Sequence, residues 1–344
     1  MEINGLKEKI ENYDGRKIRI MEVCGTHTHE IFRLGVRSLL PKNIELISGP
    51  GCPVCVTPVS FIDEAVYLAK TGKTIFTFGD LVRVPGSDKT LANARQAGAK
   101  VEIVYSPLDA LQYAKNHPEE EIVFLSVGFE TTTPASLLAL KQAIAKSVKN
   151  FSLLTANKTM DEAYRVMAKS ADAYLYPGHV AAITGAKKLE ELKKIGISGV
   201  VTGFTAKEIL QAICFIIENA QKGEPFFGNA YENVVKPEGN KAATELVEKF
   251  TRPIDTEWRG LGILKKSGLT LKDEFTDFDA RKKFSIPKMN GTANPACKCG
   301  DVLSGKIFPK DCPLFAKVCV PEHPIGACMV SNEGACSAFY KYGI

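Results

Sequence analysis

Two thiols with two residues between them occur in residues 49–55, whose sequence is GPGCPVC. This segment is too rich in Gly and Pro to be the interior of a helix or a strand. We expect a short strand before it and, after it, a helix that Thr57 caps and Pro58 begins. Because the positive end of a helix favours thiolate over thiol, redox or metal chemistry is predicted for Cys52 and Cys55.

A third thiol opens the motif CGTHTHE at residues 24–30. A thiol close to an imidazole is suited either to a nucleophile–base pair or to soft ligation of iron. The alternative for His29 and Glu30 is that they only begin a helix that continues over residues 31–34. We predict a functional role for Cys24.

Six of the ten cysteines fall in the last 48 residues. Their spacing is Cys297-x14-Cys312-x6-Cys319-x16-Cys336, with Cys299 and Cys328 as additional thiols. Four thiolates in a loop-rich segment suit a cubane iron–sulfur cluster or a zinc ion, and spacing alone leaves both open. Cys214 stands alone in an apolar helical stretch and is expected in the core.

The bulk composition excludes several classes of function. The chain has 344 residues, 45% of them hydrophobic and 24% charged, with a net charge of +5, as in ordinary soluble proteins. No dense basic run alternates with aromatic residues, so nucleic-acid binding is not indicated. The sequence has neither an apolar signal core nor an apolar run of membrane-spanning length, so we expect a cytoplasmic protein without a disulfide framework.

Strand-like runs alternate with helical patterns over the first two thirds of the chain, which predicts α/β domains with parallel sheets. The expected strands cover 17–23, 44–48, 74–78, 101–104, 121–127, 152–155, 173–176 and 199–202. The simplest division is into two α/β domains, 1–118 and 119–235. Residues 236–344 begin with a helix at 240–250 and continue as a loop-rich domain with little core, for which a metal would compensate.

Polar loops follow most of these strands, at the edge where parallel α/β sheets bind ligands. The loops cover residues 24–27, 49–55, 78–86, 126–133, 176–180 and 202–204. Their shared position predicts a site at the junction of the two domains.

Taken in order, residues 24–30, 49–55, 78–86 (FGDLVRVPG) and the C-terminal cysteines resemble the HypD family of maturation factors for nickel–iron hydrogenases. The resemblance extends over essentially the whole chain. It implies two Rossmann-like domains and a small domain that holds a [4Fe–4S] cluster.

The resemblance also implies an assembly scaffold with redox activity. Together with a small partner, HypC, it would hold an iron atom while cyanide, delivered from the thiocyanate-bearing HypE, and carbon monoxide are attached. The Fe(CN)2CO unit would then pass to the precursor of the hydrogenase large subunit. By the same resemblance, Cys24 would bind the iron with His27 nearby, and Cys52 and Cys55 would form a redox dithiol. The implied cluster ligands are Cys297, Cys312, Cys319 and Cys336.

Two other functions compete with the scaffold. An iron–sulfur thiol–disulfide reductase would use the cluster with Cys52 and Cys55, but it leaves the Cys24 motif unexplained. A zinc-stapled binding module without redox chemistry leaves the C-x-x-C pair unexplained.

Overall fold

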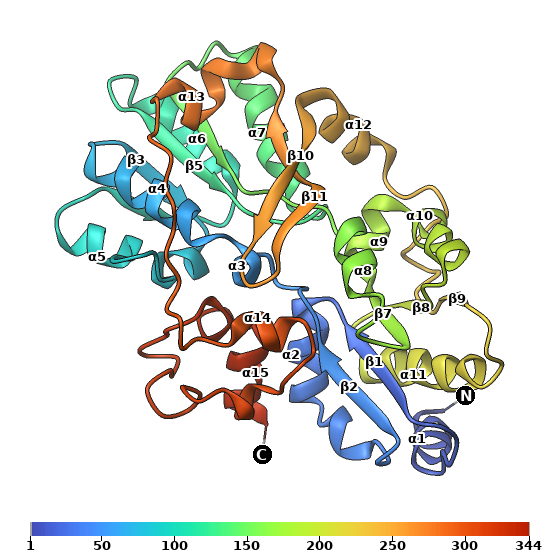
Figure 1. Ribbon diagram of the computed structural model, residues 1–344. Coiled ribbons are helices and arrows are strands. Elements are labelled where there is room, and N and C mark those ends of the chain that lie inside the picture. Colours follow the sequence, from blue (N-terminus) through green and yellow to red (C-terminus); the bar gives the residue numbers. More distant parts are fainter. Residues whose placement is uncertain (1, 344) are drawn as a thin grey trace.

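The computed structural model describes residues 2–343, and it contains two parallel sheets, one antiparallel hairpin and a cysteine-rich C-terminal region (Figure 1). The first sheet has five strands in the order β2-β1-β7-β8-β9. These strands are β1 (Ile18–Glu22), β2 (Ile44–Ser48), β7 (Ala173–Pro177), β8 (Gly199–Thr202) and β9 (Phe227–Asn229). All four strand pairs are parallel.

Alternate side chains of the first sheet enter two different cores, as the period of a strand requires. On one face, Ile18, Ile20 and Leu175 pack with the helices α1 (Ile3–Glu11) and α11 (Ala206–Ala220). Cys214 lies in this core, as predicted. The opposite face packs against the short helices α8 (Asp161–Met167), α9 (Gly178–Thr184) and α10 (Ala186–Glu190).

The second sheet has four parallel strands in the order β4-β3-β5-β6. They are β3 (Thr74–Thr77), β4 (Val101–Ile103), β5 (Ile122–Ser126) and β6 (Phe151–Thr155). One face is covered by α4 (Val59–Lys70) and α5 (Leu91–Gln96), and the other by α6 (Pro107–Asn116) and α7 (Thr133–Ala145). The predicted α/β class is confirmed, and the two parallel sheets are consistent with Rossmann-like domains.

The sheets are not built from consecutive halves of the chain. The chain leaves the first sheet after β2, forms the whole second sheet, and returns to the first sheet with β7. The division at residue 118 therefore does not coincide with the sheets, since β3 pairs with β5 and β1 pairs with β7, and both of those partners follow residue 118. All these strands are short apolar runs, so the local pattern does not specify which sheet each one joins.

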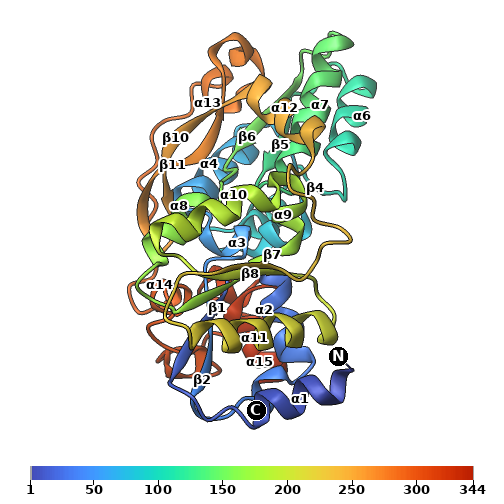
Figure 2. The same cartoon turned by 90° about the vertical axis from the view of Figure 1, so that its right-hand side faces the viewer.

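The segment after α12 (Lys241–Phe250) forms an antiparallel hairpin, β10 (Thr251–Trp258) and β11 (Gly262–Leu271), where the sequence predicted loops. The sequence pattern did not indicate these strands because Pro253 interrupts the first and both expose charged residues. The hairpin lies beside β6, with the N–H of Leu269 bonded to the carbonyl of Asn157 at 2.9 Å. Figure 2 shows it running along the edge of the second sheet.

The C-terminal region contains α13 (Ala280–Lys283), α14 (Cys299–Leu303) and α15 (Ala335–Tyr342), joined by long irregular segments. It packs on α2 (Gly25–Arg33), where the rings of Phe32 and Phe339 are 5.4 Å apart. Among residues 2–343, no helix has the length and apolar character needed to cross a bilayer.

Candidate functional site

The Cys52–Cys55 pair lies on a helical turn at the centre of the molecule, α3 (Pro53–Val56), between the hairpin and the C-terminal region (Figure 1). Cys52 is the N-cap of α3, and its Sγ accepts the backbone N–H of Cys55 at 3.3 Å. The predicted strand-to-helix turn is confirmed, but the predicted capping of the following helix by Thr57 is wrong. Thr57 ends α3, and Pro58 caps α4 without being its first residue.

The Cys24 loop touches this turn because β1 and β2 are neighbouring strands. Cys24 follows β1 and is the N-cap of α2, and the N–H of Gly25 donates to the carbonyl of Gly51 at 3.0 Å. A Cβ atom at Gly51 would lie 2.1 Å from the backbone nitrogen of Cys24. Only glycine allows the two thiol-bearing loops to approach so closely.

The pKa of the Cys24 thiol is raised to about 11, chiefly by burial; the backbone N–H of His27 acts to lower it, and the nearby Glu333 carboxylate acts to raise it. Glu333 comes from the C-terminal region and accepts a hydrogen bond from Thr26 at 2.6 Å. No local signal in the sequence connects Glu333 with this site. In this environment Cys24 is a protonated thiol, from which binding of a soft metal ion would displace the proton.

His27 is fully buried, and its Nε2 lies 2.9 Å from the carbonyl oxygen of Gly203. Burial lowers the pKa of His27 to about 4, so the ring is neutral. Because a carbonyl accepts only from N–H, Nε2 carries the proton and Nδ1 keeps its lone pair. Within residues 2–343 this Nδ1 has no hydrogen-bond partner. The loop at 202–204 therefore meets the Cys24 motif, as its strand-end position predicted, whereas His29 and Glu30 are ordinary members of α2.

The second thiol of the pair, Cys55, lies 4.0 Å from the carbonyl oxygen of Ala327 and packs in the same core as the C-terminal thiol Cys328. Burial raises the pKa of Cys55 well above its usual value, contrary to the lowering expected from the helix end. A single turn such as α3 has too weak a dipole to offset complete desolvation.

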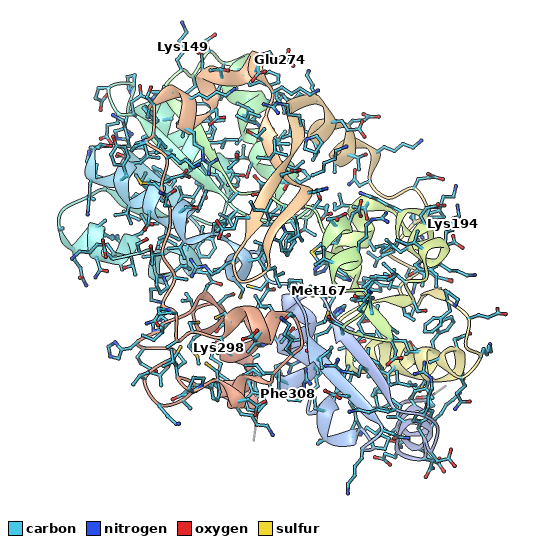
Figure 3. All side chains as sticks on the ribbon, in the orientation of Figure 1. Lys149, Met167, Lys194, Glu274, Lys298 and Phe308 are labelled. Carbon is cyan, nitrogen blue, oxygen red and sulfur yellow. The ribbon has the colours of Figure 1, made fainter. Side chains whose placement is uncertain are left out.

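The C-terminal thiols gather beside this pair. The sulfur atoms of Cys297 and Cys299 are 3.2 Å apart, and Cys328 packs in one core with Cys299 and Cys336. A Cβ at Gly326 would lie 2.4 Å from the sulfur of Cys299, so this glycine admits the thiols. Lys298, between Cys297 and Cys299, marks the place in Figure 3.

The predicted ligands are distributed unequally over this group. Cys297, Cys319 and Cys336 pack in the same core as Cys299 and Cys328. Cys312 is half-buried after a 3₁₀ turn (Pro309–Asp311), and it is not a member of this core.

The residues 2–343 include no three His, Cys, Asp or Glu side chains already arranged around a metal position. The donors nevertheless are thiols in a region with little core of its own, which fits a small iron–sulfur domain. The identity of the four ligands stays a prediction.

Two polar residues from the predicted strand-end loops, Glu130 and Tyr176, and a third that the sequence did not indicate, Tyr164, lie in the interior near Cys24. Glu130 follows β5, and burial raises its pKa to about 7, although its Oε1 accepts the N–H of Met160 at 2.9 Å. The rings of Tyr164 and Tyr176 are 5.1 Å apart, and Tyr164 lies close to both Glu130 and Cys24. Over the described residues, Glu130 Oε2 and both hydroxyl groups lack partners, so this interior can still form hydrogen bonds.

Comparison with known proteins agrees with the motifs. The HypD model, described as the hydrogenase formation hypA family, matches residues 2–343. The hydrogenase maturation factor HypD of Cupriavidus necator is 40% identical, over 97% of this chain and 92% of that protein. HypD of Escherichia coli strain K12 is 41% identical, and HypD of Azotobacter vinelandii is 39% identical, each over 95% of this chain and 90% of the relative. With this agreement along almost its whole length, the chain belongs to the HypD family of hydrogenase maturation factors.

Proposed function

We propose that this chain is the scaffold on which, together with a HypC-type partner, an iron atom acquires cyanide and carbon monoxide. The finished Fe(CN)2CO unit then passes to the precursor of a hydrogenase large subunit. The observation that carries the proposal is the contact between the Cys24 loop and the Cys52–Cys55 turn, through the bond of Gly25 to Gly51 at 3.0 Å. It joins a soft metal donor to a pair of thiols that can carry electrons.

Cys24 is the thiolate that this chain offers to the iron. Thiolates are suitable donors for a low-spin iron with cyanide and carbonyl ligands. A cysteine of the partner completes the thiolate pair, so that separation of the two proteins opens the coordination sphere for transfer. His27 does not ligate the iron. Its unprotonated Nδ1 accepts a hydrogen bond and orients groups around Cys24.

The Cys52–Cys55 pair supplies electrons for cyanide transfer from a HypE-type thiocyanate. Releasing a cyanide anion from a thiocyanate consumes two electrons and leaves a thiolate. Oxidation of Cys52 and Cys55 to a disulfide provides those two electrons and releases two protons. When bound by Cys297, Cys312, Cys319 and Cys336, a [4Fe–4S] cluster would supply single electrons that restore the dithiol.

The test is an infrared measurement on complexes of this chain with its small partner, purified without oxygen. Cys24→Ala should still form the complex and keep the C-terminal cluster, but it should lack the bands of metal-bound cyanide and carbon monoxide. Cys214→Ala is the matched control, because it removes a buried thiol from the other face of the first sheet. Bands of wild-type intensity in Cys24→Ala would mean that the iron is held elsewhere.

The second candidate is a thiol–disulfide reductase that uses only the cluster and the dithiol. The packing of Cys55 and Cys328 in one core is compatible with this activity. A reductase of this kind would give no role to the buried surroundings of Cys24. There, among the described residues, His27, Tyr164 and Tyr176 each have a polar atom without a hydrogen-bond partner. We therefore favour the scaffold.

A further inference from the structure

Arg259 is a buried arginine in the turn of the β10–β11 hairpin. Only 7% of its surface is exposed. Its backbone N–H donates to the carbonyl of Val56 at 2.9 Å, and its Nε donates to the carbonyl of Thr57 at 2.8 Å. A third bond joins its Nη2 to the carbonyl of Pro85 at 3.2 Å. Arg259 is therefore fixed against the residues that directly follow Cys55.

The same turn packs on the cysteine-rich segment. A Cβ at Gly260 would lie 2.4 Å from the Cα of Gly300, so two glycines allow these backbones to touch. Arg259 also lines a groove of about 430 Å³ together with Cys297 and Cys299. The guanidinium group thus lies between the turn that carries Cys52 and Cys55, here called the dithiol turn, and the C-terminal thiols.

The charge of Arg259 has no carboxylate partner among the described residues, since its three bonds all go to backbone carbonyls. Burial lowers the pKa of Arg259, and thiolate forms of Cys299, Cys328, Cys297 and Cys55 would oppose this effect. A buried cation without a compensating anion is costly. The groups placed to compensate it are sulfur atoms.

We propose that Arg259 is the counter-cation of the C-terminal thiols and stabilises the more reduced, more negative state of the cluster that they hold. The inference rests on the proposed function, because it requires the cluster. It assigns Arg259 as a positioning residue that acts on the cluster through its charge and does not ligate it. An electron is then easier to place on the cluster, next to the dithiol that receives it.

The test is a redox titration of the anaerobically purified protein, followed by electron paramagnetic resonance, with iron and sulfide measured on the same samples. Arg259→Gln removes the charge but keeps a donor, and it should lower the midpoint potential. We expect at least a tenfold change in the equilibrium, which is about 59 mV for a one-electron couple. Arg259→Lys keeps the charge and should retain most of the wild-type potential.

Arg83→Gln is the matched control. Arg83 also donates to a carbonyl of the C-terminal region, that of Pro321 at 3.0 Å, but it is exposed, so its loss should leave the potential unchanged. If Arg259→Gln loses its cluster while Arg259→Lys keeps it, the charge is again required and the inference stands.

An unchanged potential in Arg259→Gln would overturn the inference and leave the cluster assignment intact. An equal fall of the midpoint potential in Arg259→Lys and Arg259→Gln would also overturn the inference, because Arg259 would then act through its hydrogen bonds and not through its charge. Wild-type protein without iron and sulfide would overturn the cluster assignment itself, and this inference with it.

Discussion

The Sγ of Cys55 lies 4.0 Å from the carbonyl oxygen of Ala327, which comes from the opposite end of the chain and directly precedes Cys328. Cys55 belongs to the dithiol turn after β2, and Cys328 belongs to the cysteine-rich region that contacts α2. The two sets of sulfur atoms therefore lie in one shared core. Each of the following predictions tests one part of this arrangement.

Gly51→Ala should destabilise the protein and separate the two thiol-bearing loops. The new Cβ would lie 2.1 Å from the nitrogen of Cys24, a backbone atom that cannot rotate away. Overpacking of this kind costs about 1–3 kcal/mol or more. Denaturant unfolding measures the loss. Gly79→Ala is the control, since its Cβ would meet nothing closer than 3.7 Å, and equal stability of the two variants would contradict the prediction.

Cys52 and Cys55 should cycle between dithiol and disulfide. Both are buried, so the protein must be quenched in acid and unfolded before alkylation and mass spectrometry. We expect both sulfurs to be protected after oxidation and both to be labelled after reduction. Cys52→Ser should abolish maturation while the spectrum of the cluster is kept. Full maturation with this variant would make the dithiol a structural feature.

The anaerobically purified protein should be brown and contain about four irons and four sulfides per chain. Serine variants of Cys297, Cys312, Cys319 and Cys336 should each lose this content and destabilise the C-terminal region. Cys214→Ser should keep it, because Cys214 packs with α1 in another core.

Cys312 is the most informative of these positions, because among the four predicted ligands it is the one outside the core that the other three share. If Cys312→Ser keeps the cluster and Cys299→Ser or Cys328→Ser loses it, the ligand assignment is wrong. A purified protein with stoichiometric zinc and no sulfide would show that these cysteines form a zinc site and not a cluster.

Glu130→Gln should change how stability depends on pH. Burial raises the pKa of Glu130 from 4.5 to about 7, so the folded protein binds this proton more tightly than the unfolded chain. The resulting contribution to the free energy of unfolding is fully present below pH 4.5 and is lost as the pH rises to about 7. The stability of the glutamine variant relative to wild type should therefore increase across this window, by about 3 kcal/mol at most.

Unfolding by denaturant at closely spaced pH values measures this difference. The comparison with wild type cancels every titration that the two proteins share. A constant difference between pH 4 and 8 would show that Glu130 is not titrating with the raised pKa.

The sequence predicted the parts of the site that follow from strand ends. Cys24 and Gly51 meet because β1 and β2 pair, and Gly203 reaches His27 because β8 ends at the same edge of the sheet. Each of these positions depends on a short apolar strand and a polar loop, which are local signals.

The sequence could not predict contacts made by segments without a distinctive pattern. Glu333 and Arg259 come from a loop and from a hairpin with charged strands, and they reach Cys24 and the dithiol turn only in the folded chain. The interleaving of the sheets was missed for a related reason, since buried parallel strands resemble one another. The raised pKa of Cys55 depends on its complete burial in the folded chain, which no spacing rule supplies.

The return of the chain to the first sheet with β7 has a consequence for how the protein is made. Until residues 173–177 emerge from the ribosome, β1 has an unpaired edge, and until residue 203 emerges, His27 lacks the carbonyl of Gly203. The second sheet, by contrast, is continuous in sequence and can fold earlier, as contiguous units do during synthesis. Long-range pairing of this kind is slow. The surroundings of Cys24 are therefore expected to close late in synthesis, after the second sheet has folded, which limits the time during which a half-built site could capture a metal ion.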